Sequence, residues 1–134
     1  MEPLAKTRPI SVLLVEDEAI ISEWVKDTLV DDGFTVHAVA TAREAMHYLN
    51  SNADVDVLFT DINLPGDMDG SQLARVARDL RPDLTVVYAS GRVRQVDPKM
   101  GVPGSTFIPK PYMPSQICSL LQRIVTPRAL FTTH

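Results

Sequence analysis

Short apolar segments alternate along the chain with longer segments in which apolar residues recur every three or four positions. The short segments have strand length and are rich in β-branched residues, and they occur at residues 10–15, 34–38, 57–60, 85–89 and 106–108. The longer segments have the period of amphipathic helices, and they cover residues 19–31, 41–49, about 70–81 and 114–125. This alternation predicts an α/β fold with a doubly wound parallel sheet and helices on both of its faces.

Capping and stop signals support these helices. Thr41 with Glu44 forms a capping box, Gly33 stops the first helix, Pro82 ends the third, and Pro114 suits the first turn of the last. The apolar positions predict which side chains face the core. They are Ile20, Ile21, Trp24, Val25, Thr28 and Leu29, then Ala42, Ala45, Met46 and Leu49, then Leu73, Val76, Ala77 and Leu80, and finally Ile117, Leu120, Leu121, Ile124 and Val125.

The segment between the fourth and fifth strands departs from the alternation. Two prolines and two glycines, Pro98, Gly101, Pro103 and Gly104, interrupt residues 91–105, where another helix would be expected. At most a short helix near residues 92–97 fits there. We therefore expect five strands with a short or irregular fourth helix, in one domain over residues 9–126 with tails at 1–8 and 127–134.

Composition limits the classes of function. A chain of 134 residues with 45% hydrophobic side chains suits a single domain with its own core. The net charge of −4 argues against a nucleic-acid partner, and we interpret the spacing of Arg75, Arg78 and Arg81 as a solvated helix face.

Cysteine content and hydropathy indicate the compartment. The single cysteine, Cys118, excludes an internal disulfide and fits a reducing environment, where we expect it to pack in the core. No apolar stretch approaches the roughly 18 to 20 residues that span a bilayer. We therefore expect a cytoplasmic protein without a membrane partner.

Three of the predicted strands end in charged residues. The first runs into Glu16, Asp17 and Glu18, the third into Asp61, and the fifth into Lys110. Because parallel strands end at one edge of their sheet, these charges are expected to meet there. Two carboxylates about 4 Å apart repel by roughly 4 kcal/mol at an effective dielectric near 20. The pattern predicts a divalent metal site beside a lysine that awaits an anion, while Glu18 is interpreted as the acidic first turn of a helix.

Four stretches together resemble the receiver domain of bacterial two-component response regulators, over about residues 9–126. They are residues 12–18 (VLLVEDE), 60–66 (TDINLPG), 88–91 (YASG) and 107–111 (FIPKP). The resemblance implies a flavodoxin-like fold with strand order 2-1-3-4-5. With Tyr112 after Lys110 and Pro111, the chain is also similar to atypical, stand-alone receivers of alphaproteobacteria.

The resemblance implies a phosphoryl-accepting site. Asp61 would attack the phosphorus of a phosphohistidine and form an acyl phosphate, which requires the charge of the phosphoryl group to be neutralised. Glu16 and Asp17 would hold Mg²⁺ (or Mn²⁺) together with Asp61 and the backbone carbonyl of Asn63, because Mg²⁺ prefers oxygen ligands and keeps several waters.

The remaining site residues are also assigned by resemblance. Ser90 and Lys110 would each contact a phosphoryl oxygen. Phe107 occupies the position of an aromatic that rotates inward on activation, although a plain core role is equally open. Asn63 and Arg92 match variable positions that tune the lifetime of the phosphoryl group.

The function implied is that of a single-domain response regulator. Its donor would be a histidine kinase or a histidine phosphotransfer protein, and its output would be contact with an unknown downstream protein or onward phosphotransfer. The protein would catalyse only its own phosphorylation and dephosphorylation, and we expect no effector domain after residue 126. The loop after Asp61 is one residue longer than usual, and the irregular segment 91–105 alters the usual output face.

Three other functions remain as alternatives. A receiver-like scaffold would bind its partner without phosphorylation. A phosphohydrolase similar to haloacid dehalogenases would need a second aspartate where this chain has Asn63. A flavodoxin-like nucleotide binder is disfavoured because the first strand ends in acidic residues rather than in a glycine-rich loop.

Overall fold

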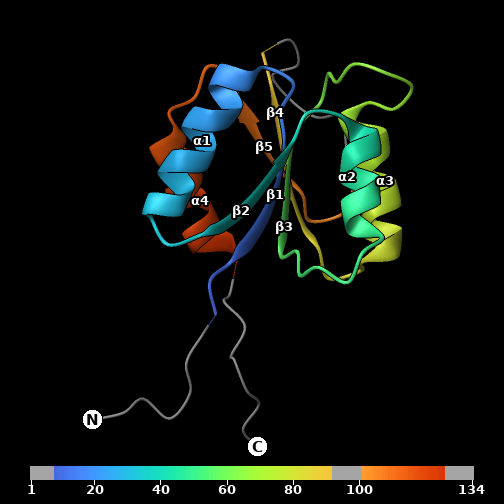
Figure 1. The fold of residues 1–134 in the computed structure, drawn as a ribbon, viewed down its shortest axis with the longest axis horizontal. Coiled ribbons are helices and arrows are strands. Elements are labelled where there is room, and N and C mark those ends of the chain that lie inside the picture. Colours follow the sequence, from blue (N-terminus) through green and yellow to red (C-terminus); the bar gives the residue numbers. More distant parts are fainter. Residues whose placement is uncertain (1–7, 92–100, 126–134) are drawn as a thin grey trace, which may run out of the picture.

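The computed structural model describes residues 8–91 and 101–125 of the chain. These residues form one parallel sheet with helices on its faces. Its strands lie in the order β2-β1-β3-β4-β5, as the resemblance implied (Figure 1). Their bounds are β1 (Ser11–Val15), β2 (Thr35–Val39), β3 (Val57–Asp61), β4 (Thr85–Ser90) and β5 (Thr106–Pro109). The predicted fold class is confirmed.

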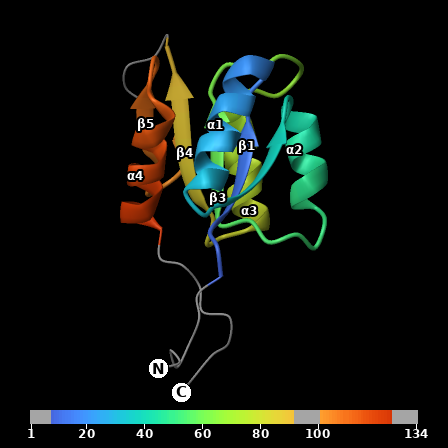
Figure 2. The same cartoon turned by 60° about the vertical axis from the view of Figure 1, so that its left-hand side comes forward.

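Helices cover both faces of the sheet. Two of them, α1 (Ala19–Asp31) and α4 (Pro114–Ile124), pack against each other on one face, while α2 (Ala42–Leu49) and α3 (Gly70–Leu80) cover the other (Figure 1). Figure 2 shows α1 in front of β1 and β3, with α4 beside β5. The short helix expected near residues 92–97 lies outside the described residues, and residues 101–105 contain no helix.

The core forms two layers, one on each side of the sheet. Side chains alternate between the faces of a strand, so that Leu14 packs with Ile117 on one side and Leu13 packs with Leu73 on the other. Residues of β3 are buried along the whole strand. A sheet buried on both faces explains why its strands appear in the sequence as continuous apolar runs. Cys118 is buried in the first layer, as predicted.

The predicted inner faces of the helices are partly wrong at their edges. On α1, Val25 and Leu29 are fully buried, but Ile20 is 84% exposed and Trp24 is 49% exposed. The helix packs along the stripe that contains residues 21, 25 and 29, and positions 20 and 24 lie about 100° away around the helix. Leu80 and Ile124, at the last positions of α3 and α4, are likewise exposed although they were expected in the core.

Side-chain caps fix where two helices begin. The predicted capping box of α2 is present, because the Thr41 hydroxyl accepts from the Glu44 amide at 3.1 Å. A second capping box that the sequence reading missed opens α3, where the Asp69 carboxylate accepts from the Gln72 amide at 2.8 Å. None of the helices in the described residues is long and apolar enough to cross a membrane.

Candidate functional site

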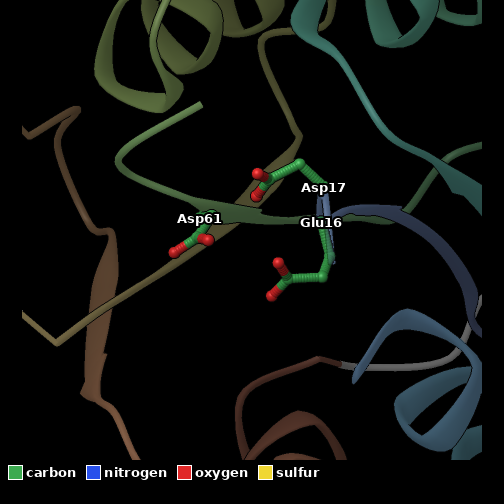
Figure 3. A group of neighbouring side chains, drawn as sticks. All are labelled: Glu16, Asp17 and Asp61. Carbon is green, nitrogen blue, oxygen red and sulfur yellow. The ribbon is translucent and has the colours of Figure 1, made fainter. Parts of the chain in front are cut away.

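Three carboxylates meet at the carboxyl edge of the sheet. Glu16 and Asp17 follow β1, Asp61 ends β3, and a carboxylate oxygen of each lies within 4.8 Å of the others (Figure 3). The reason is the pairing of the strands, since Val15 lies opposite Thr60 and the next residue on each strand is acidic. The structure thus brings together the acidic residues that the sequence placed at strand ends, and they can hold a metal ion.

The three carboxylates differ in their access to solvent. The side chains of Glu16 and Asp61 are nearly covered, with 4% and 9% of each residue exposed, whereas Asp17 is exposed. Glu18 lies at the N-cap of α1, one residue before the helix rather than in its first turn, and its amide donates to Glu16 at 3.1 Å. The cluster is therefore buried at Glu16 and Asp61 and accessible to solvent at Asp17.

Lys110 joins the cluster from the end of β5. Its Nζ atom lies 3.0 Å from Oδ2 of Asp61 and 3.1 Å from Oε1 of Glu16. The backbone amide of Lys110 donates to the carbonyl of Ser90 at 3.0 Å, which ties the ends of β4 and β5 together. One ammonium group thus faces two buried carboxylates.

Burial and charge shift the protonation equilibria of these groups. Burial raises the pKa of Glu16 and the pKa of Asp61 above their ordinary values, although hydrogen bonds from Lys110 act in the opposite direction. Burial also disfavours the ammonium of Lys110, but its hydrogen bonds to Asp61 and Glu16 and the charges of these two carboxylates together outweigh burial and raise its pKa. The charged forms of the two carboxylates are therefore disfavoured by burial, and a nearby cation stabilises them.

Asn63 lies two residues after Asp61, and Ser90 lies on β4, the strand that pairs with β3. Ser90 ends β4 and is 2% exposed, and the Asn63 amide nitrogen lies 3.5 Å from its hydroxyl oxygen. The roles assigned to both residues, including the Asn63 carbonyl as a metal ligand, stay predictions.

The two residues assigned to switching or tuning have different outcomes. Phe107 lies on β5, half-buried against the core layer that contains Leu13, and its switch role stays a prediction. Arg92 lies outside the described residues.

Gly70 contributes to the site through its lack of a side chain. It opens α3 directly against the backbone of Asp61, where a Cβ atom would overlap the Asp61 carbonyl. Its amide also donates to the carbonyl of Ile62 at 2.7 Å. This close approach folds residues 62–69 tightly over the end of β3, a constraint that glycine alone satisfies.

Tyr112, which the sequence analysis named only as part of the resemblance, is a neighbour of the site. Its ring packs near Phe59, with centroids 5.7 Å apart, and burial together with Glu16 raises its pKa to about 12. It borders a cleft of about 410 Å³, whose lining comprises Glu18, Ile21, Trp24, Val25, Gly91, Lys110, Pro111 and Tyr112. The available signal was its position, two residues after Lys110.

Comparisons with known proteins place the chain in a family. Residues 12–122 match the family model described as the response regulator receiver domain. A solved response regulator receiver protein from Sinorhizobium medicae superposes with a TM-score of 0.80 at 36% identity, covering 86% of this chain and 93% of that one.

Two curated relatives contain a similar region within longer proteins. Sensor kinase CckA of Brucella abortus is 31% identical over 86% of this chain but only 12% of its own length. Aerobic respiration control protein ArcA of Escherichia coli is 31% identical over 79% of this chain and 44% of its own length. The chain therefore spans less than half of either relative.

Proposed function

Because the chain belongs to the response regulator receiver family, we propose that it accepts a phosphoryl group on Asp61 from a histidine kinase or a histidine phosphotransfer protein. The observation that carries this proposal is the setting of Asp61. Its carboxylate lies in an acidic cluster with Glu16 and Asp17, and its Oδ2 atom is 3.0 Å from the Lys110 ammonium.

The acidic cluster suits a hard divalent cation. Three carboxylates offer oxygen atoms within 4.8 Å of one another, and Mg²⁺ prefers oxygen ligands while it keeps several waters. We propose that Glu16, Asp17, Asp61 and the backbone carbonyl of Asn63 hold Mg²⁺, or Mn²⁺ in its place. When bound, the ion neutralises charge on the phosphoryl group.

The side chains then share the work of the transfer. A carboxylate oxygen of Asp61 forms the new bond to phosphorus while the bond from phosphorus to the donor histidine nitrogen breaks. Lys110 exchanges its contact with Asp61 for a phosphoryl oxygen, and the Ser90 hydroxyl donates to another. Arrangement of these groups before the reaction lowers its barrier.

The receiver domain that we propose for residues 9–126 has a wider role in signalling. We propose that the modified protein signals through contact with a downstream protein or passes its phosphoryl group onward, and that its catalysis is limited to its own phosphorylation and dephosphorylation. A scaffold that ignores phosphorylation is the alternative, and it would retain its partner affinity when Asp61 is replaced by alanine.

Intact-protein mass spectrometry tests the proposal. We expect incubation with acetyl phosphate and Mg²⁺ to add one phosphoryl group, and we expect Asp61→Asn or chelation of the metal to prevent the addition. Asp67→Asn is the matched control, because Asp67 is a nearby loop aspartate whose side chain is 95% exposed. Folded wild-type protein that gains no phosphoryl group from acetyl phosphate or from a competent donor kinase would contradict the proposal.

A further inference from the structure

A compact turn at residues 101–105 leads directly into β5. Within residues 101–105, the Ser105 amide donates to the carbonyl of Val102 at 3.1 Å, and Gly104 adopts a left-handed conformation with φ of 75°. The Val102 side chain is 7% exposed and belongs to the same core layer as Tyr88. The turn is therefore packed into the fold, and β5 begins immediately after it.

Two side chains from other elements hold this turn. Tyr88 of β4 is fully buried, and its hydroxyl accepts from the backbone amide of Val102 at 3.1 Å. Arg78 of α3 donates through Nη1 to the carbonyl of Pro103 at 2.8 Å. The two contacts hold the successive residues Val102 and Pro103, one from β4 and one from α3. Together we call them the clamp.

The clamp fixes the point at which the chain enters β5. This strand has four residues and pairs with β4, so that Tyr88 lies opposite Phe107 and Ser90 lies opposite Pro109. A shift of one residue in such a pairing turns every side chain to the other face. A strand this short has few ladder bonds of its own, which makes its register sensitive to the turn before it.

The register of β5 decides where Lys110 lies. Lys110 follows the last residue of β5, its amide is bonded to Ser90, and its ammonium reaches Asp61 and Glu16. The three carboxylates, in contrast, follow β1 or end β3, and neither of these strands pairs with β5. A displaced turn would therefore move the ammonium while leaving the carboxylates in place.

We propose that Tyr88 and Arg78 are positioning residues that act through Lys110: by clamping the turn at residues 101–105, they hold β5 in the register that places the ammonium beside Asp61. This inference rests on the proposed function, in which Lys110 contacts the phosphoryl group. It predicts that the clamp affects phosphoryl transfer more than metal binding.

Conservative substitutions measure the effect. Tyr88→Phe removes only the hydroxyl, and Arg78→Gln removes the guanidinium. We expect each to slow phosphorylation by acetyl phosphate roughly three- to tenfold, which is less than the roughly 100-fold cost of a full 1 Å misplacement because each variant removes only one of the two contacts that hold the turn. Mg²⁺ affinity, followed by the fluorescence of the single tryptophan Trp24 beside the site, should stay within about twofold.

Two matched controls contact residues outside β5 and outside the turn before it. Tyr48→Phe makes the same chemical change on α2, where the Tyr48 ring stacks on His37. Arg81→Gln removes a guanidinium that donates to the carbonyl of Leu49 at 3.0 Å, a contact of the same kind as that of Arg78. Both controls should leave the phosphorylation rate unchanged.

A double-mutant comparison separates positioning from general stabilisation. In a Lys110→Ala background, Tyr88→Phe should cause no further slowing of the residual rate, because the group it positions is gone. Three results would contradict the positioning role of the clamp. They are an equal slowing factor for Tyr88→Phe in the Lys110→Ala background, a parallel loss of Mg²⁺ affinity, and no slowing by Tyr88→Phe in the wild-type background.

Hydrogen exchange keeps this test independent of phosphorylation. Tyr88→Phe should speed exchange of the Lys110 amide, and Tyr48→Phe should not. If wild-type protein takes up no phosphoryl group, the proposed function fails. The exchange rate of the Lys110 amide then still tests whether the clamp positions Lys110. Unchanged exchange at Lys110 in Tyr88→Phe would overturn it.

Discussion

The two ends of the sheet use aspartate in opposite ways. At the amino end, the Asp56 carboxylate accepts from the Ser11 amide at 2.8 Å and lies 3.7 Å from the Arg8 guanidinium, which also pairs with Asp54 at 2.6 Å. At the carboxyl end, Asp61 is crowded by other carboxylates and shares Lys110 with one of them.

The difference separates a structural acid from a reactive one. Asp56 joins β1 to the start of β3, because its carboxylate accepts a hydrogen bond from the Ser11 amide and lies beside the Arg8 guanidinium. Asp61 is buried among like charges, and that burial raises its pKa. An acid that the fold leaves poorly neutralised is available to a metal ion and to phosphorus, whereas a matched acid stabilises the fold and has no capacity left for chemistry.

The largest effect that should separate the two ends is loss of Lys110. We expect Lys110→Ala to slow phosphorylation by acetyl phosphate about 100-fold, the typical result of removing one group that stabilises transition-state charge. Arg8→Ala, the matched removal of a cation at the amino end, should leave this rate within about twofold. Equal slowing by both variants, in a rate assay at saturating Mg²⁺, would remove the distinction.

Metal binding should distinguish the ends next. Mg²⁺ at ten times its dissociation constant should raise the free energy of unfolding by about 1.4 kcal/mol, because it binds the folded state. Urea titrations with Mg²⁺ and with a chelator measure the difference. Asp17→Asn should reduce it and Asp54→Asn should not, and a gain that persists in Asp17→Asn would place the ion elsewhere.

Removal of the reactive charge should stabilise the fold. In metal-free buffer at neutral pH, we expect Asp61→Asn to raise the free energy of unfolding by on the order of 1 kcal/mol, because burial raises the pKa of Asp61 and so disfavours its charged form, while Lys110 keeps Glu16 as its partner. Asp56→Asn should lower it instead, because that acid has its partners. Denaturant titrations of both variants give the comparison directly.

The pH dependence of this gain follows from the raised pKa of Asp61. A raised pKa means that the folded state favours the protonated form, so Asp61 contributes stability below its unfolded pKa of about 3.8 and loses it as the pH rises through the folded value. The advantage of Asp61→Asn should therefore shrink as the pH falls toward 4. An advantage that grows on acidification would contradict this reading.

The smallest expected effect is structural and confined to the amino end. Arg8→Ala should destabilise the protein by about 0.5 to 1 kcal/mol, because the guanidinium is paired but close to the surface. High salt should reduce the difference between wild type and variant. A loss independent of salt would point to packing of the arginine stem instead.

The arrangement of the site follows from features that the sequence displays. β-branched runs that end in charge, separated by amphipathic helices, are sufficient to predict a parallel sheet whose acidic strand ends meet. The grouping of Glu16, Asp17 and Asp61 with Lys110 is a consequence of that topology, since it needs no knowledge of individual side-chain packing.

Features that depend on tertiary packing were beyond sequence pattern. The exposure of Ile20 and Trp24 is set by how α1 rotates against β1 and α4, which helical period alone does not specify. The closeness of Gly70 to Asp61 and the bond between Tyr88 and Val102 each join residues through the folded chain. Such contacts have no local sequence signature.

The most direct test of the central claim is to locate the phosphoryl group chemically. Protein phosphorylated with acetyl phosphate and Mg²⁺ is treated with borohydride, which reduces an aspartyl phosphate to homoserine, and its peptides are mapped by mass spectrometry. We expect homoserine at position 61, with Asp17, Asp54 and Asp56 unchanged. Homoserine at another aspartate, or none in protein that carries the added mass, would contradict it.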